Sequence, residues 1–208
     1  MNDPPRFDAI GGRANVFAGR ATAVYIPTDT KFSVEAVSPV EAALCRAPSD
    51  LAGEPRLVGP EKVKVSVRGR ETFEREVHEI LDPAFPAKRL LVGETFNKAG
   101  QWSSYPPHKH DRAAYPEESK MEEVYLFKVD PPQGFGLQRF YSPERGVDVA
   151  VILQHNSVTR IPWGYHPVAA APGYRLYYLW MLAGEDRKYA LADDPAHAWV
   201  KDGTAASP

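Results

Sequence analysis

Three histidines and one glutamate occur in an order that could bind a metal ion. His108 and His110 are separated by one residue in the segment QWSSYPPHKHD, residues 101–111. On an extended strand, side chains two residues apart point to the same face, so both imidazoles could reach one ion. Glu123 follows at the start of the apolar run VYLF, and His166 comes just after a Pro-x-Gly turn. Imidazole and carboxylate ligands together are typical of a first-row divalent metal, and we expect these four residues to bind Zn, Mn or Fe.

Each of the four residues also has an ordinary structural interpretation. Histidines in a proline-rich loop are often exposed, and a single histidine after a turn is commonly a hydrogen-bonded core residue. The agreement of all four positions, each in a strand-like segment, favours the metal site. Glu123 is preferred to Glu122 because adjacent strand residues face opposite ways, and Glu123 shares its face with Tyr125 and Phe127. His78 has charged neighbours and no ligand spacing, so we expect it at the surface.

Several other polar residues could take part in the chemistry. We expect Asp111 to hydrogen-bond a ligand imidazole, with a surface or turn role as the alternative. Arg139 could bind a substrate carboxylate through two parallel hydrogen bonds, or could equally face solvent. Tyr165 and Tyr178 are candidates to bring a phenol to the site. The general base stays open among a tyrosine, Lys109 and a metal-bound water.

The ligand types allow two kinds of reaction. A divalent metal with open coordination positions can polarise the carbonyl and hydroxyl of a sugar-like substrate, which would assist aldose–ketose isomerisation. The same ligands could activate dioxygen if the metal were Fe(II). Ligand identity does not decide between these reactions.

Short strands joined by turns are expected to position these residues. The sequence has 20 prolines in 208 residues, about twice the usual share, which disfavours long helices. Residues 40–48 are expected to form a buried strand, and Val63, Val65 and Val67 should face inward on another. Residues 122–130 predict a strong strand, with residues 134–142 as its antiparallel neighbour. Further apolar segments at short spacing favour an all-β sandwich or barrel.

Composition excludes several other classes of protein. A formal net charge of -2 gives no electrostatic reason to expect a nucleic acid or an anionic membrane as partner. The N-terminus lacks the basic and apolar regions of a signal peptide, and no apolar run approaches the length needed to span a bilayer. A single cysteine excludes an intramolecular disulfide framework. We therefore expect a cytoplasmic protein with a small-molecule substrate.

Longer segments carry a family resemblance. The ligand order, with a Pro-x-Gly turn before the last histidine, looks like the cupin β-barrel. The segments WSSYPPHKHD, EEVYLF, PPQGFGLQRFY, GYHPVAAAPGY and LYYLWMLAG together resemble the 5-deoxy-glucuronate isomerase family of myo-inositol catabolism, which is related to 5-keto-4-deoxyuronate isomerase. Upstream segments, from RFDAIGGRANVF to LVGPEKVKVSVRGR, resemble the same family. The resemblance implies a bicupin fold whose C-terminal barrel holds the metal, and conversion of 5-deoxy-D-glucuronate to 5-dehydro-2-deoxy-D-gluconate. The family's ligand pattern falls on His108, His110, Glu123 and His166.

The chain departs from this family at its N-terminus, where members usually carry several dozen more residues. We therefore expect an incomplete, metal-free first cupin half in residues 1–58 and a metal-binding barrel with a tail in residues 59–208. Missing strands would expose a sheet edge that a second subunit could cover, so a homo-oligomer is a further expectation. Three rival functions stay open: the related uronate isomerase, an Fe(II) cupin dioxygenase and a non-catalytic sugar-binding cupin.

Overall fold

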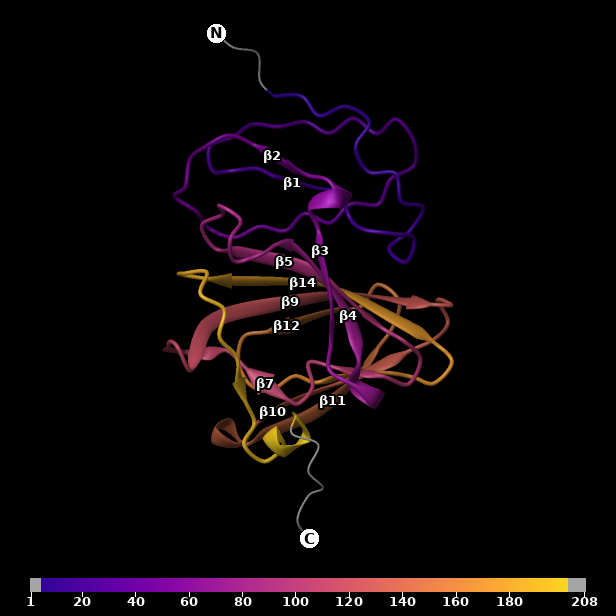
Figure 1. The fold of residues 1–208 in the computed structure, drawn as a ribbon, viewed down its shortest axis with the longest axis vertical. Helices are drawn as coiled ribbons and strands as arrows, with labels where there is room; N and C mark the ends of the chain where they lie inside the picture. The colour runs from indigo at the N-terminus through magenta and orange to yellow at the C-terminus, as the bar shows by residue number, and fades with distance from the viewer. Residues whose placement is uncertain (1–4, 202–208) are drawn as a thin grey trace.

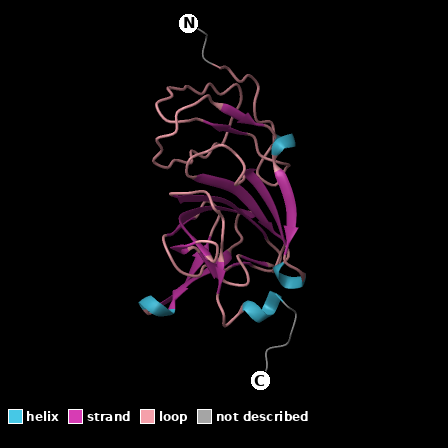
Figure 2. Ribbon diagram, turned by 60° about the vertical axis from the view of Figure 1, so that its left-hand side comes forward, coloured by secondary structure: helices cyan, strands magenta, loops and turns pink. Residues whose placement is uncertain are grey.

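The structure is a computed structural model that describes residues 5–201, in which β-strands predominate (Figures 1 and 2). The strands are β1 (Ala23–Tyr25), β2 (Arg56–Val58), β3 (Lys64–Arg68), β4 (Arg75–Leu81), β5 (Leu90–Asn97), β6 (Trp102–Ser103), β7 (His108–Lys109), β8 (Asp111–Ala114), β9 (Glu118–Asp130), β10 (Gly136–Ser142), β11 (Val147–Leu153), β12 (Val158–Ile161), β13 (Val168–Ala170), β14 (Arg175–Gly184) and β15 (Ala192–Asp193). The short 3-10 turns are η1 (Pro60–Lys62), η2 (Glu71–Phe73), η3 (Pro143–Arg145) and η4 (Ala198–Lys201). None of the helical turns in residues 5–201 has the length or apolarity to cross a bilayer. The expected all-β fold is confirmed.

Two antiparallel sheets enclose the main core. The larger has seven strands in the order β12-β9-β14-β5-β4-β3, with β8 paired to β9, and the smaller has the order β11-β10-β13-β6. In Figure 1 the larger sheet crosses the middle of the molecule, and β10 and β11 lie below it. Residues of β9 and β14 face Leu153 and Val168 of the smaller sheet across a buried cluster that includes Phe127 and Leu176. This two-sheet arrangement is the cupin architecture that the family resemblance implies.

Strand β9 shows how the sequence aims its side chains into this core. Met121, Tyr125, Phe127 and Val129 are each at most 2% exposed, whereas Glu122 between them is exposed. Because successive side chains on a strand point to opposite faces, Glu123 must point inward with the buried set. Glu123 is indeed buried, as expected from the alternation.

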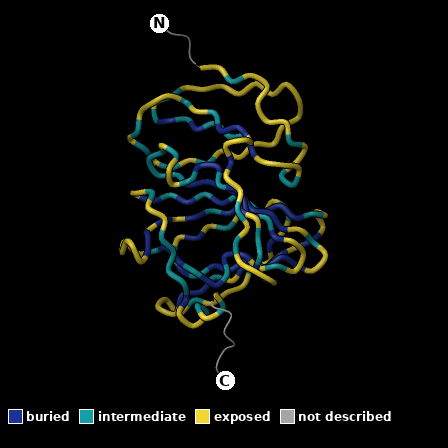
Figure 3. Tube along the Cα trace, in the orientation of Figure 1, coloured by how far each residue is buried: buried dark blue, intermediate teal, exposed yellow. Residues whose placement is uncertain are grey.

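The N-terminal segment covers the other face of the larger sheet. A second buried cluster joins Tyr25 and Val58, from the small β1–β2 sheet, to Ile80 and Val92 on β4 and β5. Figures 1 and 3 show this segment above the larger sheet, with much of its outer trace exposed. The main core and the covering segment therefore lie on opposite faces of one sheet.

Three expectations about strands are wrong. Residues 134–142 form β10, which pairs with β11 and β13 in the smaller sheet, while β9 pairs with β12, β14 and β8. Residues 40–48 form no strand, because the small sheet contains only β1 and β2 and no strand pairs with this segment. Val40 and Leu44 are consequently exposed. On the edge strand β3, Val65 is 39% exposed and Val67 63%, so only the preceding Val63 is buried as expected.

Candidate metal centre and adjoining cavity

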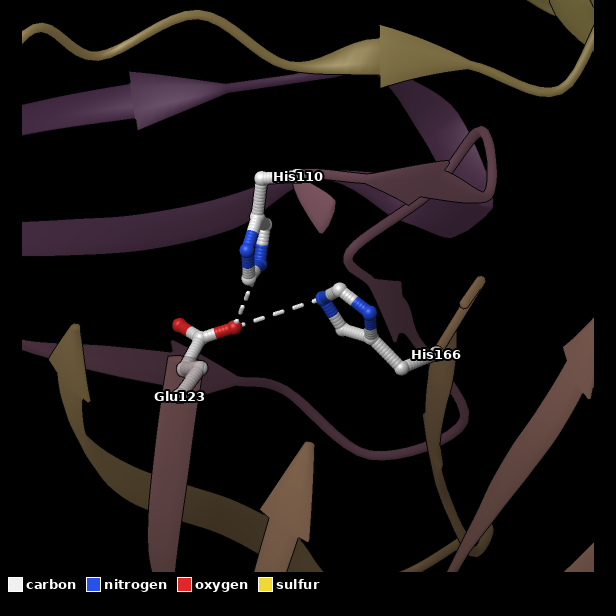
Figure 4. Close-up of side chains that lie close together, drawn as sticks. All are labelled: His110, Glu123 and His166. Carbon is white, nitrogen blue, oxygen red and sulfur yellow. Dashed lines mark hydrogen bonds and ion pairs between the residues drawn. The ribbon is translucent and has the colours of Figure 1, made fainter. Parts of the chain in front are cut away.

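Three of the four predicted ligands meet inside the barrel. His110 directly follows β7, Glu123 lies on β9, and His166 follows the Pro162–Gly164 turn that leads to β13. Glu123 Oε2 lies 3.1 Å from His110 Nε2 and 3.3 Å from His166 Nε2, as Figure 4 shows. All three side chains are buried, and their ligand atoms lie within 4.8 Å of one another. The group could hold one metal ion.

The hydrogen bonds of the two imidazoles show why a cation fits between them. His110 Nδ1 donates to the carbonyl of Met121 at 3.0 Å, and His166 Nδ1 donates to the carbonyl of Gly164 at 2.9 Å. Because a carbonyl only accepts, each Nδ1 must carry a hydrogen, which leaves the Nε2 of a neutral ring as a lone pair. His166 Nε2 is buried with no hydrogen-bond partner among residues 5–201. Two nitrogen lone pairs aimed at a carboxylate repel it unless a cation lies between, and this donor set suits a divalent metal.

The charges of the group lead to the same conclusion. Burial by itself would raise the pKa of Glu123, but the hydrogen bond with His110 and the nearby imidazole of His166 outweigh it and lower that pKa to about 2. Burial would likewise lower the pKa of His110, but its hydrogen bond to Glu123 raises it. The carboxylate is therefore ionised at neutral pH and attracts positive charge, whether this is a proton on His110 or a metal ion.

His108 lies beside this group. Its ring meets the ring of His166 edge to face, with centroids 5.0 Å apart, and lies 6.4 Å from that of His110. Burial, followed by the nearby charges of His166 and His110, lowers the pKa of His108 well below its usual value. A neutral imidazole is the form that binds a metal. The structure thus brings His108 to the site in a form that could act as a ligand.

Asp111 supports His166 through one intermediate residue and does not bond an imidazole directly. Asp111 Oδ2 accepts a hydrogen bond from the backbone N–H of Gly164 at 2.8 Å, and the carbonyl of Gly164 accepts from His166. Lys109 Nζ lies 2.7 Å from Asp111 Oδ1 and 3.1 Å from Glu118 Oε2. Lys109 is therefore engaged with two carboxylates on the side of the strand away from the metal ligands, which argues against it as a general base.

A cavity of about 130 Å³ opens onto the candidate metal centre. His108, His110 and Glu123 line it together with Tyr125 and Tyr178. The hydroxyl of Tyr178 donates to Ser103 Oγ at 2.9 Å, and that of Tyr125 lies 3.1 Å from Ser104 Oγ. Burial raises the pKa of both phenols. Both tyrosines therefore keep their hydroxyl protons at neutral pH.

Two of the sequence candidates lie outside this cavity. Arg139 is exposed on β10, where Nε and Nη2 donate to the carboxylate of Asp148 at 2.8 and 2.7 Å. Tyr165 stacks on Tyr141, with centroids 4.9 Å apart. On β10 the fully buried residue is Gln138, so the alternation of the strand turns Arg139 outward.

Two side chains of β4 lie where the sequence did not predict them. Arg75 on β4 lines the cavity. Its spacing of two residues from the apolar Val77 could have predicted that both side chains face the same side of the strand. His78 is 5% exposed, contrary to the surface position expected for it. It lies on the opposite face of the larger sheet, where its Nδ1 is 3.7 Å from Glu94 Oε2.

Comparisons with known proteins identify relatives over nearly the whole chain. The family model described as KduI/IolB matches residues 2–200. A 5-deoxy-glucuronate isomerase of Geobacillus kaustophilus is 43% identical over 203 residues, covering 97% of this chain and 74% of that protein. A protein of the same name from Bacillus subtilis strain 168 is 43% identical over 196 residues, covering 93% of this chain and 72% of that protein. The crystal structure of an IolB-like protein from Salmonella typhimurium aligns with a TM-score of 0.71 and 41% identity, over 74% of this chain and 58% of that one.

Proposed function

This chain belongs to the KduI/IolB family, and we propose that it is a 5-deoxy-glucuronate isomerase of myo-inositol catabolism. The reaction would convert 5-deoxy-D-glucuronate to 5-dehydro-2-deoxy-D-gluconate, an aldose–ketose isomerisation, in the cytoplasm. Relatives with 43% identity carry that name. The observation that carries the proposal is the buried group of His110, Glu123 and His166, in which His166 Nε2 has no hydrogen-bond partner and the other two residues line a cavity.

We further propose that His108 completes the ligand set of the metal. Its ring is adjacent to that of His166, and its lowered pKa keeps it neutral at physiological pH. A bound divalent ion would act there as a Lewis acid on the carbonyl and neighbouring hydroxyl of the sugar acid. Metal analysis of the purified protein would identify the ion as Zn, Mn or Fe.

The tyrosines of the cavity are proposed to hold protons during the reaction. Isomerisation moves one proton from C2 to C1 and another from the C2 hydroxyl to the C1 oxygen. Tyr178 and Tyr125 stay protonated because burial raises the pKa of each. When substrate binds, each hydroxyl would turn from its serine partner, Ser103 or Ser104, and donate to a substrate oxygen instead. Replacing Tyr178 with Phe should lower kcat by about 10- to 100-fold while leaving the metal content unchanged. An unaltered kcat would remove Tyr178 from the reaction.

The test combines metal analysis of the purified protein with an NMR assay on 5-deoxy-D-glucuronate. We expect about one metal ion per chain and conversion to the ketose. The variants His166→Ala and Glu123→Gln should lose both metal and turnover, whereas the control His155→Ala, whose Nδ1 bonds the backbone of Val129, should keep both. A metal-free active enzyme would overturn the site. Metal binding without turnover would overturn the isomerase, and oxygen consumption would identify the dioxygenase.

The domain boundary and the oligomeric state are two further predictions. The division at residue 58 falls at the end of β2, but its limits of 1–58 and 59–208 extend beyond the described residues at both ends. A homo-oligomer stays a prediction, which light scattering of the purified protein would test.

A further inference from the structure

Three cationic side chains line the cavity at the metal centre, and they differ in how their charge is balanced. Arg68 Nη2 lies 3.0 Å from Glu79 Oε1, and Lys201 pairs with Asp193. Arg75 forms no ion pair with any carboxylate of residues 5–201. A half-buried guanidinium without an anionic partner is costly, because burial disfavours its charge. Burial indeed lowers the pKa of Arg75, and the positive charge of Arg68 adds to the effect.

The hydrogen bonds of Arg75 leave one edge of its guanidinium unused. Nη1 donates to the carbonyls of Phe73 and Tyr105, each at 3.2 Å. These bonds fix the plane of the group. Nε and Nη2 have no partner in the described part of the chain, and together they form the edge that binds a carboxylate through two parallel hydrogen bonds. Arg75 is therefore held in place with its carboxylate-binding edge unoccupied by protein.

Arg75 also occupies a suitable position relative to the metal ligands. It is the first residue of β4, where Val77 also lines the cavity, so the strand alternation directs both side chains inward. A second hollow of about 330 Å³ shares Arg75, Tyr105, Pro106 and Lys201 with the cavity of about 130 Å³. Arg75 thus lies where the two spaces meet, while His110 and Glu123 line only the smaller one.

We propose that Arg75 binds the carboxylate of the sugar-acid substrate through Nε and Nη2. The inference rests on the proposed function, since it takes a substrate with an aldehyde at one end and a carboxylate at the other. Held at Arg75, the molecule presents its C1 and C2 oxygens to the group of His110, Glu123 and His166. Arg75 then takes the role that the sequence suggested for Arg139, and it makes the enzyme select an acid over a neutral sugar of the same length.

The test compares two substrates on the metal-loaded enzyme. One is 5-deoxy-D-glucuronate, and the other is 5-deoxy-D-glucose, which carries CH₂OH in place of the carboxylate. In Arg75→Met we expect kcat/KM for the acid to fall by about 10- to 100-fold, mainly through KM, with no change for the neutral sugar. Arg75→Lys keeps the charge but not the paired N–H edge, so its preference for the acid should lie between those of Met and wild type. The matched control Arg139→Met should behave as wild type, because Arg139 lies outside the cavity.

The ratio of kcat/KM for the acid to kcat/KM for the neutral sugar does not change when part of the enzyme is misfolded, since misfolding lowers both rates equally. An equal loss on both substrates, or an unchanged kcat/KM for the acid, would overturn the assignment of Arg75. If wild type turns over neither substrate, the proposed function fails, and calorimetric binding of 5-deoxy-D-glucuronate then decides about Arg75 alone. In that case, binding weakened at least 10-fold by Arg75→Met, with unchanged metal content, supports the carboxylate site. Equal binding by the variant and wild type overturns it.

Discussion

Replacing Asp111 tests whether the metal site depends on residues that never touch the metal. The Asp111 carboxylate accepts from the N–H of Gly164 at 2.8 Å, and the carbonyl of Gly164 holds Nδ1 of His166 at 2.9 Å. Asp111→Ala removes a charge-assisted hydrogen bond worth about 1.5–3 kcal/mol and leaves Lys109 with Glu118 as its remaining carboxylate. In a chain of this size, about 2 kcal/mol corresponds to a fall in Tm of about 4–8 °C.

The effect on metal affinity should be separable from the effect on stability. Once Gly164 is released, the ring of His166 loses its fixed orientation, and the loss of such an outer partner typically weakens metal binding by about 10- to 100-fold. Asp111→Asn keeps an oxygen that accepts from Gly164 but gives up the attraction to Lys109. We therefore expect the Asn variant to lose stability while binding metal nearly as tightly as wild type.

The assay is competition for the metal against a chromophoric chelator at fixed pH, with thermal unfolding of the same metal-free samples. A metal affinity for Asp111→Ala equal to that of wild type would refute the indirect support of His166. So would equal losses of affinity in the Ala and Asn variants, because a general electrostatic effect of the carboxylate would then explain both.

Four further predictions concern the outer face of the larger sheet and the metal site. On the outer face of the larger sheet, Arg13 Nη1 donates to the buried Glu94 at 3.2 Å. In urea titrations, Arg13→Met should therefore lower the free energy of unfolding by about 2–3 kcal/mol. The control Arg139→Met, at an exposed residue, should lower it by about 0–0.5 kcal/mol. Although burial opposes its charge, the nearby His78 and the hydrogen bonds from Arg13 lower the pKa of Glu94. Its contribution to stability is therefore present above about pH 4.3 and is lost as the pH falls through the lower folded pKa. Burial opposes the charge of His78 too, but its bond to Glu76 and the nearby carboxylate of Glu94 raise its pKa. The contribution of His78 to stability is therefore full below about pH 6.5 and is lost as the pH rises through the folded pKa. The stability of wild type, measured from pH 3 to 9, should decline at both ends of this range, and a flat profile would contradict the prediction. Gly164→Ala should weaken metal binding and lower Tm, because φ of Gly164 is +82° and an added Cβ would lie 2.7 Å from the carbonyl oxygen of Tyr141. A metal affinity and a Tm equal to those of wild type would show that the turn tolerates a side chain. Removal of the metal with a chelator should lower Tm, and Tm should rise with the concentration of free metal, because the folded protein binds the metal and the unfolded chain does not. A Tm that does not depend on metal would argue against a site inside the barrel.

The sequence alone determined the family, the all-β class and the chemical character of the site. Glu123 could be chosen over Glu122 because strand side chains alternate with a period of two, and the structure buries Glu123 and exposes Glu122. The motif segments identified the 5-deoxy-glucuronate isomerase family, which the matched relatives confirm. These features depend on local spacing and residue type, which are readable along a chain.

Only the tertiary structure decided which side chains face the cavity and which strands are neighbours. Alternation divides a strand into two faces, but the pairing of distant strands decides which face is turned inward. The pairing of β10 with β13 and β11 turns Arg139 toward solvent, and the pairing of β4 with β5 and β3 brings Arg75 to the cavity. Arg75 and Glu123 are far apart in the sequence and reach one cavity only because β4, β5, β14 and β9 are successive strands of one sheet. Such long-range registers follow from the packing of the whole core, and no short segment of the sequence encodes them.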